Sequence, residues 1–179
     1  MSTRSFICVE QDDGSYKGVY CHSDGYLTYN GAMLLDHYNS REKAEEIIAL
    51  GDLSLLCEKI NPDPEKPHGF DYDKRQEDVT VAYGRDRGEK GTEARAITLE
   101  DAKESWCEYM YVYTKENKWQ YYDLHEDNPE LRDVETDLAK EFEAMGIERP
   151  AGEYGFFPQE RIEQLKKEQA QLRKNDAVM

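Results

Sequence analysis

Two strand–turn–strand patterns constrain the fold of this chain more than any other feature. Near the N-terminus, SFICV (residues 5–9) and YKGVYC (16–21) flank a polar stretch that contains Asp13-Gly14. Later, CEYMYVYT (107–114) and KWQYYDL (118–124) flank a short Lys-Glu-Asn turn. Aromatic and β-branched residues on both sides of a tight polar turn predict a β-hairpin. The sequence therefore predicts two hairpins within an antiparallel sheet.

The second hairpin carries a clear alternation of side chains. Tyr109, Tyr111 and Tyr113 share one face of the predicted strand, and Met110 and Val112 share the other. A row of tyrosines can stack nucleic-acid bases. Because few basic residues lie nearby, we expect instead that helices pack on this face.

Further strands and helices are predicted around the hairpins. Short strands are expected at residues 53–56 and 79–83, and a proline-rich loop at 61–74. Ser40 and Thr98 are typical helix N-caps, and Asn128-Pro129 resembles a cap followed by proline at the first helical position. Helices are predicted at residues 30–38, 41–50, 99–105, 128–145 and 158–174.

Together these elements predict an α+β fold. We expect an antiparallel sheet of about 5–6 strands, built on two hairpins, with helices on one face and a helix at the C-terminus. Residues 1–148 are predicted to form a single domain, and residues 149–179 a linker and the C-terminal helix.

The charge of the chain excludes some classes of function. Its 39 acidic and 23 basic residues give a formal net charge of −16. General nucleic-acid binding needs a basic patch, and anionic membranes repel an acidic protein. We therefore expect no direct nucleic-acid partner and no membrane partner. An acidic chain is expected either to bind a basic protein or simply to gain solubility.

The N-terminus and the cysteines indicate a compartment. MSTRSFICVEQ lacks the features of a signal peptide, and no run of 18 apolar residues occurs. The four cysteines show no CxxC spacing, which favours buried thiols over disulfides. A cytoplasmic protein is predicted.

The densest acidic segment is the first candidate for a binding surface. Residues 121–148 contain ten acids but only Arg132 and Lys140 as bases. On the predicted helix, four acids at spacings of 3, 4 and 4 form one stripe, with carboxylates about 5–6 Å apart, similar to a nucleic-acid backbone. The alternative is a solvated helix face. The candidate partner-binding residues are Asp123, Glu126, Asp127, Glu130, Asp133, Asp137 and Glu141.

A second candidate site combines two loops. Cys21 and His22 are adjacent on a predicted strand and face opposite sides, which favours a buried thiol over a nucleophile or a metal ligand. The stretch GRDRGEKG (84–91) has the glycines and arginines of an anion loop but lacks the Lys-Ser/Thr ending of a phosphate loop. The alternative is a polar turn. The candidate ligand residues are Tyr20, His22, Asp24, Tyr26, Arg85 and Arg87.

No other pattern predicts chemistry. The histidines and cysteines lack zinc-ligand spacing, and the acidic pairs lack a calcium-loop pattern. We predict no catalytic residue, no metal and no cofactor, and thus no enzyme.

Several short segments of the sequence resemble those of a known group of proteins. STRSFI, GVYCHSDGY, LLDHY and VAYGRDRGE, within residues 2–124, are similar to a family of small acidic, uncharacterised proteins of phages and prophages. The chain departs from that pattern at Ser23, where an aromatic residue is expected, and at Tyr83-Gly84 before RDRGE. Small acidic phage proteins often block host defence systems, and some inhibitors of restriction and CRISPR effectors occupy basic nucleic-acid channels.

The resemblance therefore implies an anti-CRISPR or other anti-defence protein. The expected function is inhibition of a basic, nucleic-acid-binding effector of the bacterial host by an acidic surface that acts as a DNA mimic. The alternatives are a small-ligand or nucleotide-binding protein or enzyme that uses the 20–26 and 84–91 loops, and an accessory protein that forms a homodimer through its terminal helix.

Overall fold

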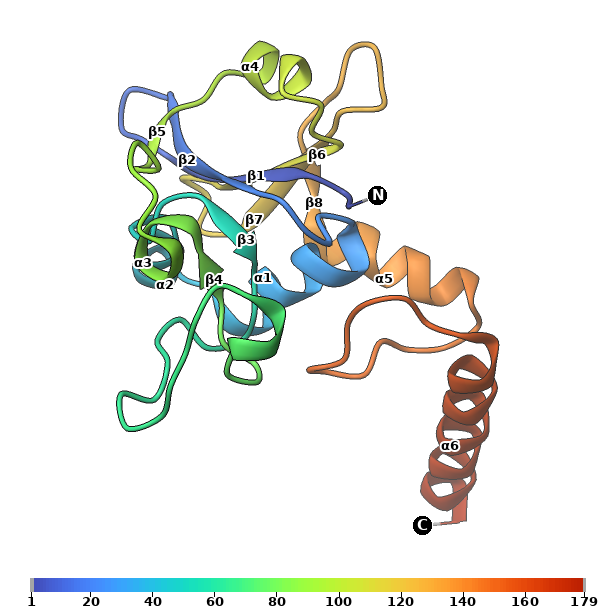
Figure 1. The fold of residues 1–179 in the computed structure, drawn as a ribbon. Coiled ribbons are helices and arrows are strands. Elements are labelled where there is room, and N and C mark those ends of the chain that lie inside the picture. Colours follow the sequence, from blue (N-terminus) through green and yellow to red (C-terminus); the bar gives the residue numbers. More distant parts are fainter. Residues whose placement is uncertain (1, 179) are drawn as a thin grey trace.

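A mixed eight-stranded sheet forms the centre of the computed structural model, which describes residues 2–178 (Figure 1). The strands are β1 (Ser5–Glu10), β2 (Tyr16–Cys21), β3 (Leu53–Leu55), β4 (Val81–Ala82), β5 (Arg95–Ala96), β6 (Tyr109–Tyr113), β7 (Trp119–Asp123) and β8 (Arg132–Asp133). Their order is β4-β3-β2-β1-β6-β7-β8, and β5 also pairs with β2. The helices are α1 (Ala32–His37), α2 (Arg41–Ile48), α3 (Tyr83–Arg87), α4 (Leu99–Glu104), α5 (Val134–Ala144) and α6 (Gln159–Val178).

The strand pairing confirms both hairpins and the α+β class. β1 pairs with β2, and β6 with β7, each antiparallel. The prediction of a purely antiparallel sheet of 5–6 strands is wrong, however, because β1 runs parallel to β6 and β2 runs parallel to β3. A hairpin signal describes neighbouring segments only, so it carries no information on how two hairpins pair with each other. β5 and β8 have two residues each, too few for a periodic pattern.

The two faces of the sheet bury separate apolar clusters. Ile7 and Val9 join the larger cluster with residues of α1, α2 and α5. Phe6 and Cys8, which alternate with them on β1, join a smaller cluster with Ala102 of α4. The prediction that helices cover one face only is therefore wrong, since α4 lies on the opposite face from α1 and α2 (Figure 1).

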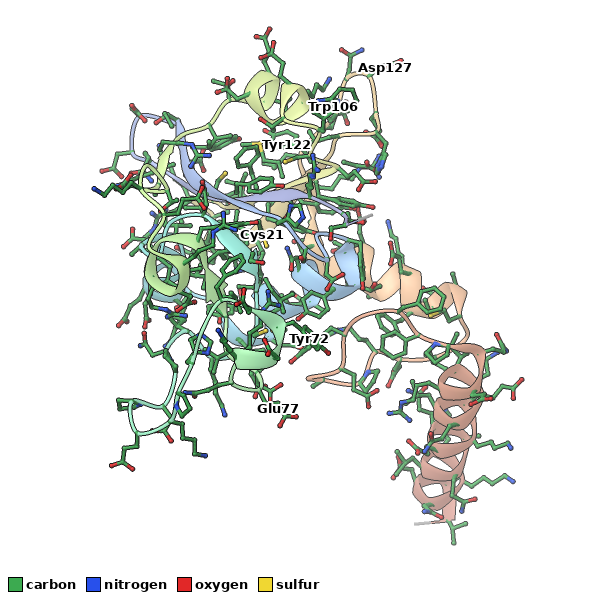
Figure 2. All side chains as sticks on the ribbon, in the orientation of Figure 1. Cys21, Tyr72, Glu77, Trp106, Tyr122 and Asp127 are labelled. Atoms are coloured by element: carbon green, nitrogen blue, oxygen red, sulfur yellow. The ribbon has the colours of Figure 1, made fainter. Side chains whose placement is uncertain are left out.

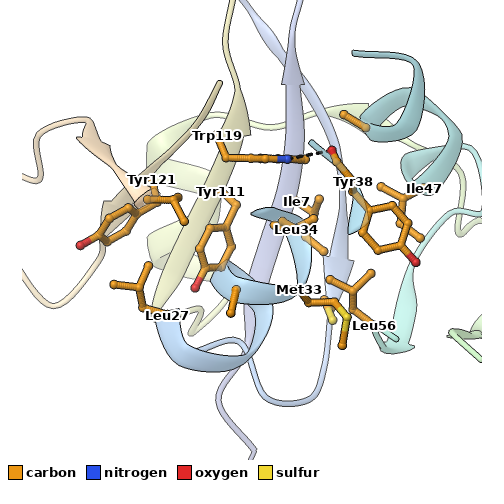
Figure 3. Close-up of a cluster of buried hydrophobic side chains, with 14 of the residues drawn as sticks. Ile7, Leu27, Met33, Leu34, Tyr38, Ile47, Leu56, Tyr111, Trp119 and Tyr121 are labelled. Atoms are coloured by element: carbon orange, nitrogen blue, oxygen red, sulfur yellow. Dashed lines mark hydrogen bonds between the residues drawn. The ribbon is translucent and has the colours of Figure 1, made fainter. Parts of the chain in front are cut away.

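The tyrosine face of β6 packs as predicted. Tyr111 and Tyr113 are buried in the larger cluster, whereas Met110 and Val112 are buried in the smaller one. Figure 3 shows Tyr111 among Leu27, Leu34 and Tyr121. The Trp119 indole N–H donates to the Tyr38 carbonyl over 2.9 Å, which satisfies its one polar group inside the core (Figure 3). These tyrosines therefore belong to the core.

Local signals predict most helix starts but misplace α5. Ser40 and Thr98 are N-caps, as predicted: the Ser40 hydroxyl accepts from Lys43 N, and the Thr98 hydroxyl accepts from Asp101 N. The Asp101 side chain in turn accepts from Thr98 N and completes a capping box. α5, however, begins at Val134 with Asp133 as its N-cap, so the predicted start at Asn128-Pro129 is wrong. Pairing of β8 with β7 holds residues 132 and 133 extended, and the helix can begin only after them.

Residues 149–165 pack against the rest of the chain. The Arg149 guanidinium donates two hydrogen bonds to Asp36, at 2.9 and 2.7 Å. The ring centroids of Phe157 and Phe142 are 4.8 Å apart, and Leu165 is buried. The remainder of α6 extends away from the sheet (Figure 1). Among the helices of residues 2–178, none combines the length and apolar character needed to cross a membrane.

Candidate functional site

The seven acidic residues predicted from the sequence follow one edge of the sheet, which we call the acidic edge. They run from the end of β7 through residues 124–131 to β8, one of the two edge strands, and onto α5. Asp127 lies near α4, at the far end of this edge from α5 (Figure 2). The four acids expected to form one helical stripe do not do so, because Glu130 precedes α5 and Asp133 caps it.

Four of the seven side chains have partners within the chain. Asp137 accepts a 2.8 Å hydrogen bond from the Tyr121 hydroxyl, and Asp133 accepts one of 2.6 Å from the Thr136 hydroxyl. Asp123 contacts His125 Nδ1 at 2.6 Å, and Glu126 pairs with Arg132. These carboxylates stabilise the local structure, so their charges are not all available to a partner.

His125 adds a positive charge to the acidic edge. Its second ring nitrogen, Nε2, lies 3.0 Å from Glu108 Oε1. The hydrogen bonds to Asp123 and then to Glu108 raise the pKa of His125 above its usual value. Since both ring nitrogens face carboxylates, the imidazolium form is favoured here.

The remaining three acids, Asp127, Glu130 and Glu141, are all exposed residues, but the carboxyl group of Glu141 is partly shielded from solvent. This partial burial, and then the neighbouring Asp137, raise the pKa of Glu141. Asp127 and Glu130 are exposed, and neither carboxylate forms an ion pair within residues 2–178. Asp127 and Glu130 are therefore the members of the acidic edge most open to a partner.

The first of the two predicted ligand loops is mostly packed. Tyr20 Oη lies 2.8 Å from His22 Nδ1, and the Tyr26 ring makes an edge contact with Tyr29. Cys21 is buried, and burial raises the pKa of its thiol to about 11. A thiol with that pKa stays protonated at neutral pH, which disfavours a nucleophilic role.

The remaining acid of this loop has an unusual backbone conformation. Asp24 has a φ of +53°. Burial raises the pKa of its carboxyl group. Left-handed backbone is more common for Asp than for most residues other than glycine, and here it forms the turn between β2 and the π-helical turn Leu27–Gly31.

The arginines of the second predicted loop are engaged within the chain. Arg85 donates to the Ile60 carbonyl at 2.6 Å and to the Thr80 carbonyl at 2.7 Å. The Arg87 guanidinium lies over the Phe70 ring, 4.7 Å from its centroid, and pairs with Glu89. The segment begins as the short helix α3 and leaves it at Gly88, with a φ of +72°. Both guanidinium groups thus connect segments of the fold.

A buried polar network at this loop was missed by the sequence reasoning. His68 Nε2 lies 3.4 Å from Asp86 Oδ2, and these side chains are only 5% and 4% exposed. His68 Nδ1 accepts from Gln76 N, and Asp86 accepts from Ala82 N and from Arg85. Burial alone would raise the pKa of Asp86, but the hydrogen bonds from Arg85 and Ala82 hold it below its usual range. No local pattern connects His68 with Asp86, so only the fold reveals this contact.

Within residues 2–178, no three His, Cys, Asp or Glu side chains come together in a way that would hold a metal ion.

Comparison with protein-family models, with curated proteins and with solved structures found no match to this chain. Its function must therefore be argued from its own surfaces.

Proposed function

We propose that the protein is a phage-derived, non-enzymatic inhibitor that acts in the cytoplasm of a bacterial host. It is an inhibitor of the anti-CRISPR type. Its acidic edge binds the basic nucleic-acid channel of a defence effector. The observation that supports this most directly is the exposure of Asp127 and Glu130, without ion-pair partners in the described chain, in a segment rich in acids.

Electrostatics supports a basic partner over a neutral one. A net charge of −16 produces a long-range attraction for a basic surface and repels nucleic acid. Carboxylates at the rim of such a contact mainly raise the association rate, and they lose their effect as salt screens them. Binding by the acidic edge should therefore weaken steeply between low and high salt.

A purely structural role is the competing explanation for the same charges. β8 is a two-residue strand at the edge of the sheet, and the other residues of the acidic edge lie on the segments that flank it. Short charged edge strands prevent sheets of different molecules from pairing. This role would require the charges but no partner, so it predicts aggregation, not loss of inhibition, when they are removed.

The test is capture followed by competition. The tagged protein is incubated with a lysate that contains defence effectors, washed at low and then high salt, and any retained protein is identified. Purified effector is then titrated with labelled duplex DNA in the presence of the protein. We expect one stoichiometric effector, released by salt, whose DNA binding falls as the protein is added.

Charge reversal identifies the surface. Asp127→Lys combined with Glu130→Lys should weaken competition by at least tenfold, since each reversal replaces an attraction by a repulsion. Glu65→Lys combined with Glu77→Lys makes the same change of charge in an exposed loop on another part of the chain. Equal competition by both double variants, or full inhibition by the Asp127 and Glu130 variant, would contradict the proposal.

The alternative of a small-ligand site stays a prediction. Changing His22 and Arg85 together should abolish function if the 20–26 and 84–91 loops bind a nucleotide. Because Arg85 also stabilises the buried network, that variant must first be shown to fold by circular dichroism. A melting temperature of the unaltered protein that rises with added nucleotide would support this alternative.

A further inference from the structure

Trp106 occupies a backbone position at the end of α4 that favours glycine. Ser105 is the C-cap of this helix, and Trp106 N donates to the Lys103 carbonyl at 3.3 Å. Cys107 N donates to the Ala102 carbonyl at 3.4 Å. These two hydrogen bonds form a Schellman motif, in which the residue after the C-cap is left-handed and is usually glycine. Trp106 adopts this left-handed conformation, with a φ of +61°.

The Trp106 side chain contributes little to the core. It is 81% exposed, whereas Trp119, the other tryptophan of the chain, is buried. Single exposed apolar side chains are common, but a bulky residue with positive φ is an outlier, and such strain occurs mainly where function requires the residue. Since Trp106 combines exposure with an unfavourable backbone, stability alone would favour glycine at this position.

Trp106 lies between two acidic segments. Lys103 Nζ donates to the Asp127 carbonyl over 2.7 Å, which holds the end of α4 against the loop of the acidic edge. Figure 2 shows Trp106 and Asp127 at the same end of the molecule. Residues 99–108 contain four acids and residues 123–130 contain four more, and Lys103 is the only Lys or Arg in these two ranges. The exposed indole is therefore set among an excess of negative charge.

Two of these acids are open to a partner. Glu104, two residues before Trp106, and Asp127 are both exposed, and neither carboxylate forms an ion pair within residues 2–178. The backbone of Arg4 also lies near, since its carbonyl accepts from Glu108 N, so one further base belongs to this region. The acids still outnumber the bases, and a cation is the favoured group beside the ring.

We propose, resting on the function proposed above, that Trp106 anchors the contact with the basic partner by receiving one of its arginine side chains. The guanidinium stacks on the indole, and Glu104 and Asp127 attract its charge. A planar, weakly hydrated guanidinium stacks on aromatic rings better than the compact ammonium of lysine. Tryptophan and arginine are also the residues that most often carry the binding energy of an interface. A nucleic-acid base is disfavoured here, because its phosphates would meet the carboxylates.

Basic peptides test the recognition of arginine without a known effector. The labelled probes are an oligoarginine and an oligolysine of equal length, whose charges attract the acidic protein equally. We expect oligoarginine to bind about fivefold more tightly, as measured by fluorescence anisotropy. Trp106→Gly should lower this preference to about twofold or less. Tyr72→Ala removes another exposed aromatic ring, far from Trp106 in Figure 2, and should leave the preference unchanged.

Competition with duplex DNA then tests the anchor on the captured effector. Trp106→Gly should weaken competition by at least about tenfold, the effect of losing a central aromatic anchor, and Tyr72→Ala should leave it unchanged. Thermal unfolding shows whether the variant folds. Because glycine suits the left-handed backbone, the melting temperature of Trp106→Gly should equal or exceed that of the unaltered protein. Binding that falls without a loss of stability separates an anchor from a structural residue.

Different results would overturn the two proposals. Full competition by Trp106→Gly would remove the arginine anchor and leave the acidic edge as the binding surface. Capture of no salt-released effector would overturn the proposed function, and the peptides would then decide the anchor by themselves: a preference for oligoarginine that depends on Trp106 supports it, and equal affinities overturn it.

Two further results would assign Trp106 to another role. A melting temperature of Trp106→Gly lower by roughly 5 °C or more would make the ring a structural residue. A mass that rises with concentration in sedimentation equilibrium, and no longer does so in Trp106→Gly, would make a second copy of this chain the occupant. Either result would overturn the inference.

Discussion

From the sequence, the acidic edge and the arginine loop at residues 84–91 are both candidate binding sites. In the fold, they differ in how many of their charged groups remain free to contact a partner. Arg85 and Arg87 are both held by groups of their own chain. On the acidic edge, Asp133 and Asp137 are used by the fold, whereas Asp127 and Glu130 remain exposed. The number of charged residues counted from a sequence is therefore only an upper limit on the number available for binding.

The chemistry of the two groups explains the difference. A guanidinium has five N–H donors in a planar fork, so it can bind several backbone carbonyls that lie around it. Carboxylates accept hydrogen bonds only, and crowded carboxylates repel one another. An acidic segment of ten acids with two bases cannot neutralise itself, and it leaves some charge at the surface.

The largest expected effect lies in the network beneath the arginine loop. Asp86→Ala removes the carboxylate from buried His68 and from Arg85, so it should lower the free energy of unfolding by about 3 kcal/mol. Glu89→Ala, which breaks only an exposed pair with Arg87, should cost less than about 1 kcal/mol. Urea denaturation measures both. Equal costs would mean that the loop arginines are not structural, and the comparison would fail.

On the acidic edge, the largest effect on stability should come from the loss of a hydrogen bond to a carboxylate. Tyr121→Phe removes the hydroxyl that donates to Asp137 and should lower stability by about 1 kcal/mol. Glu130→Ala should change it by no more than about 0.5 kcal/mol, as for other exposed positions. The pair of urea curves separates structural from free carboxylates, and a large cost at Glu130 would remove it from the proposed binding surface.

The smallest effect concerns pH. Because the folded state raises the pKa of His125, its contribution is fully present below the unfolded pKa of about 6.5 and is lost as pH rises through the folded pKa. The difference in stability between the unaltered protein and His125→Gln should therefore shrink from pH 6 towards alkaline pH. We expect about 0.5 kcal/mol at most, because solvent screens this exposed cluster. A difference that grows with pH would contradict the assignment.

Both hairpins were predictable because their signals are local. A tight polar turn between aromatic and β-branched runs determines the pairing of neighbouring strands, as for β1 with β2. Caps such as Ser40 and Thr98 are local as well. The start of α5 was not predictable, because the pairing of β8 with β7 overrides the signal of Asn128-Pro129.

The candidate site was predictable only in part. The acidic residues near 121–148 and their position on one segment follow from the sequence. Which carboxylates remain free depends on Tyr121, Thr136 and His125, and their contacts require the folded sheet. The position of Trp106 beside the acidic edge depends on the contact between Lys103 and the Asp127 carbonyl, which no local sequence pattern predicts.

The sequence by itself determined the local elements of this protein and the sign of its charge. Turn residues, caps and alternating side chains act over a few neighbours, so they can be read directly. Only the tertiary structure decided the parallel contact of β1 with β6, the helix on the second face of the sheet, and the burial of His68 with Asp86. These features depend on contacts between distant segments, and the free energy of such contacts depends on burial and geometry that no single segment encodes.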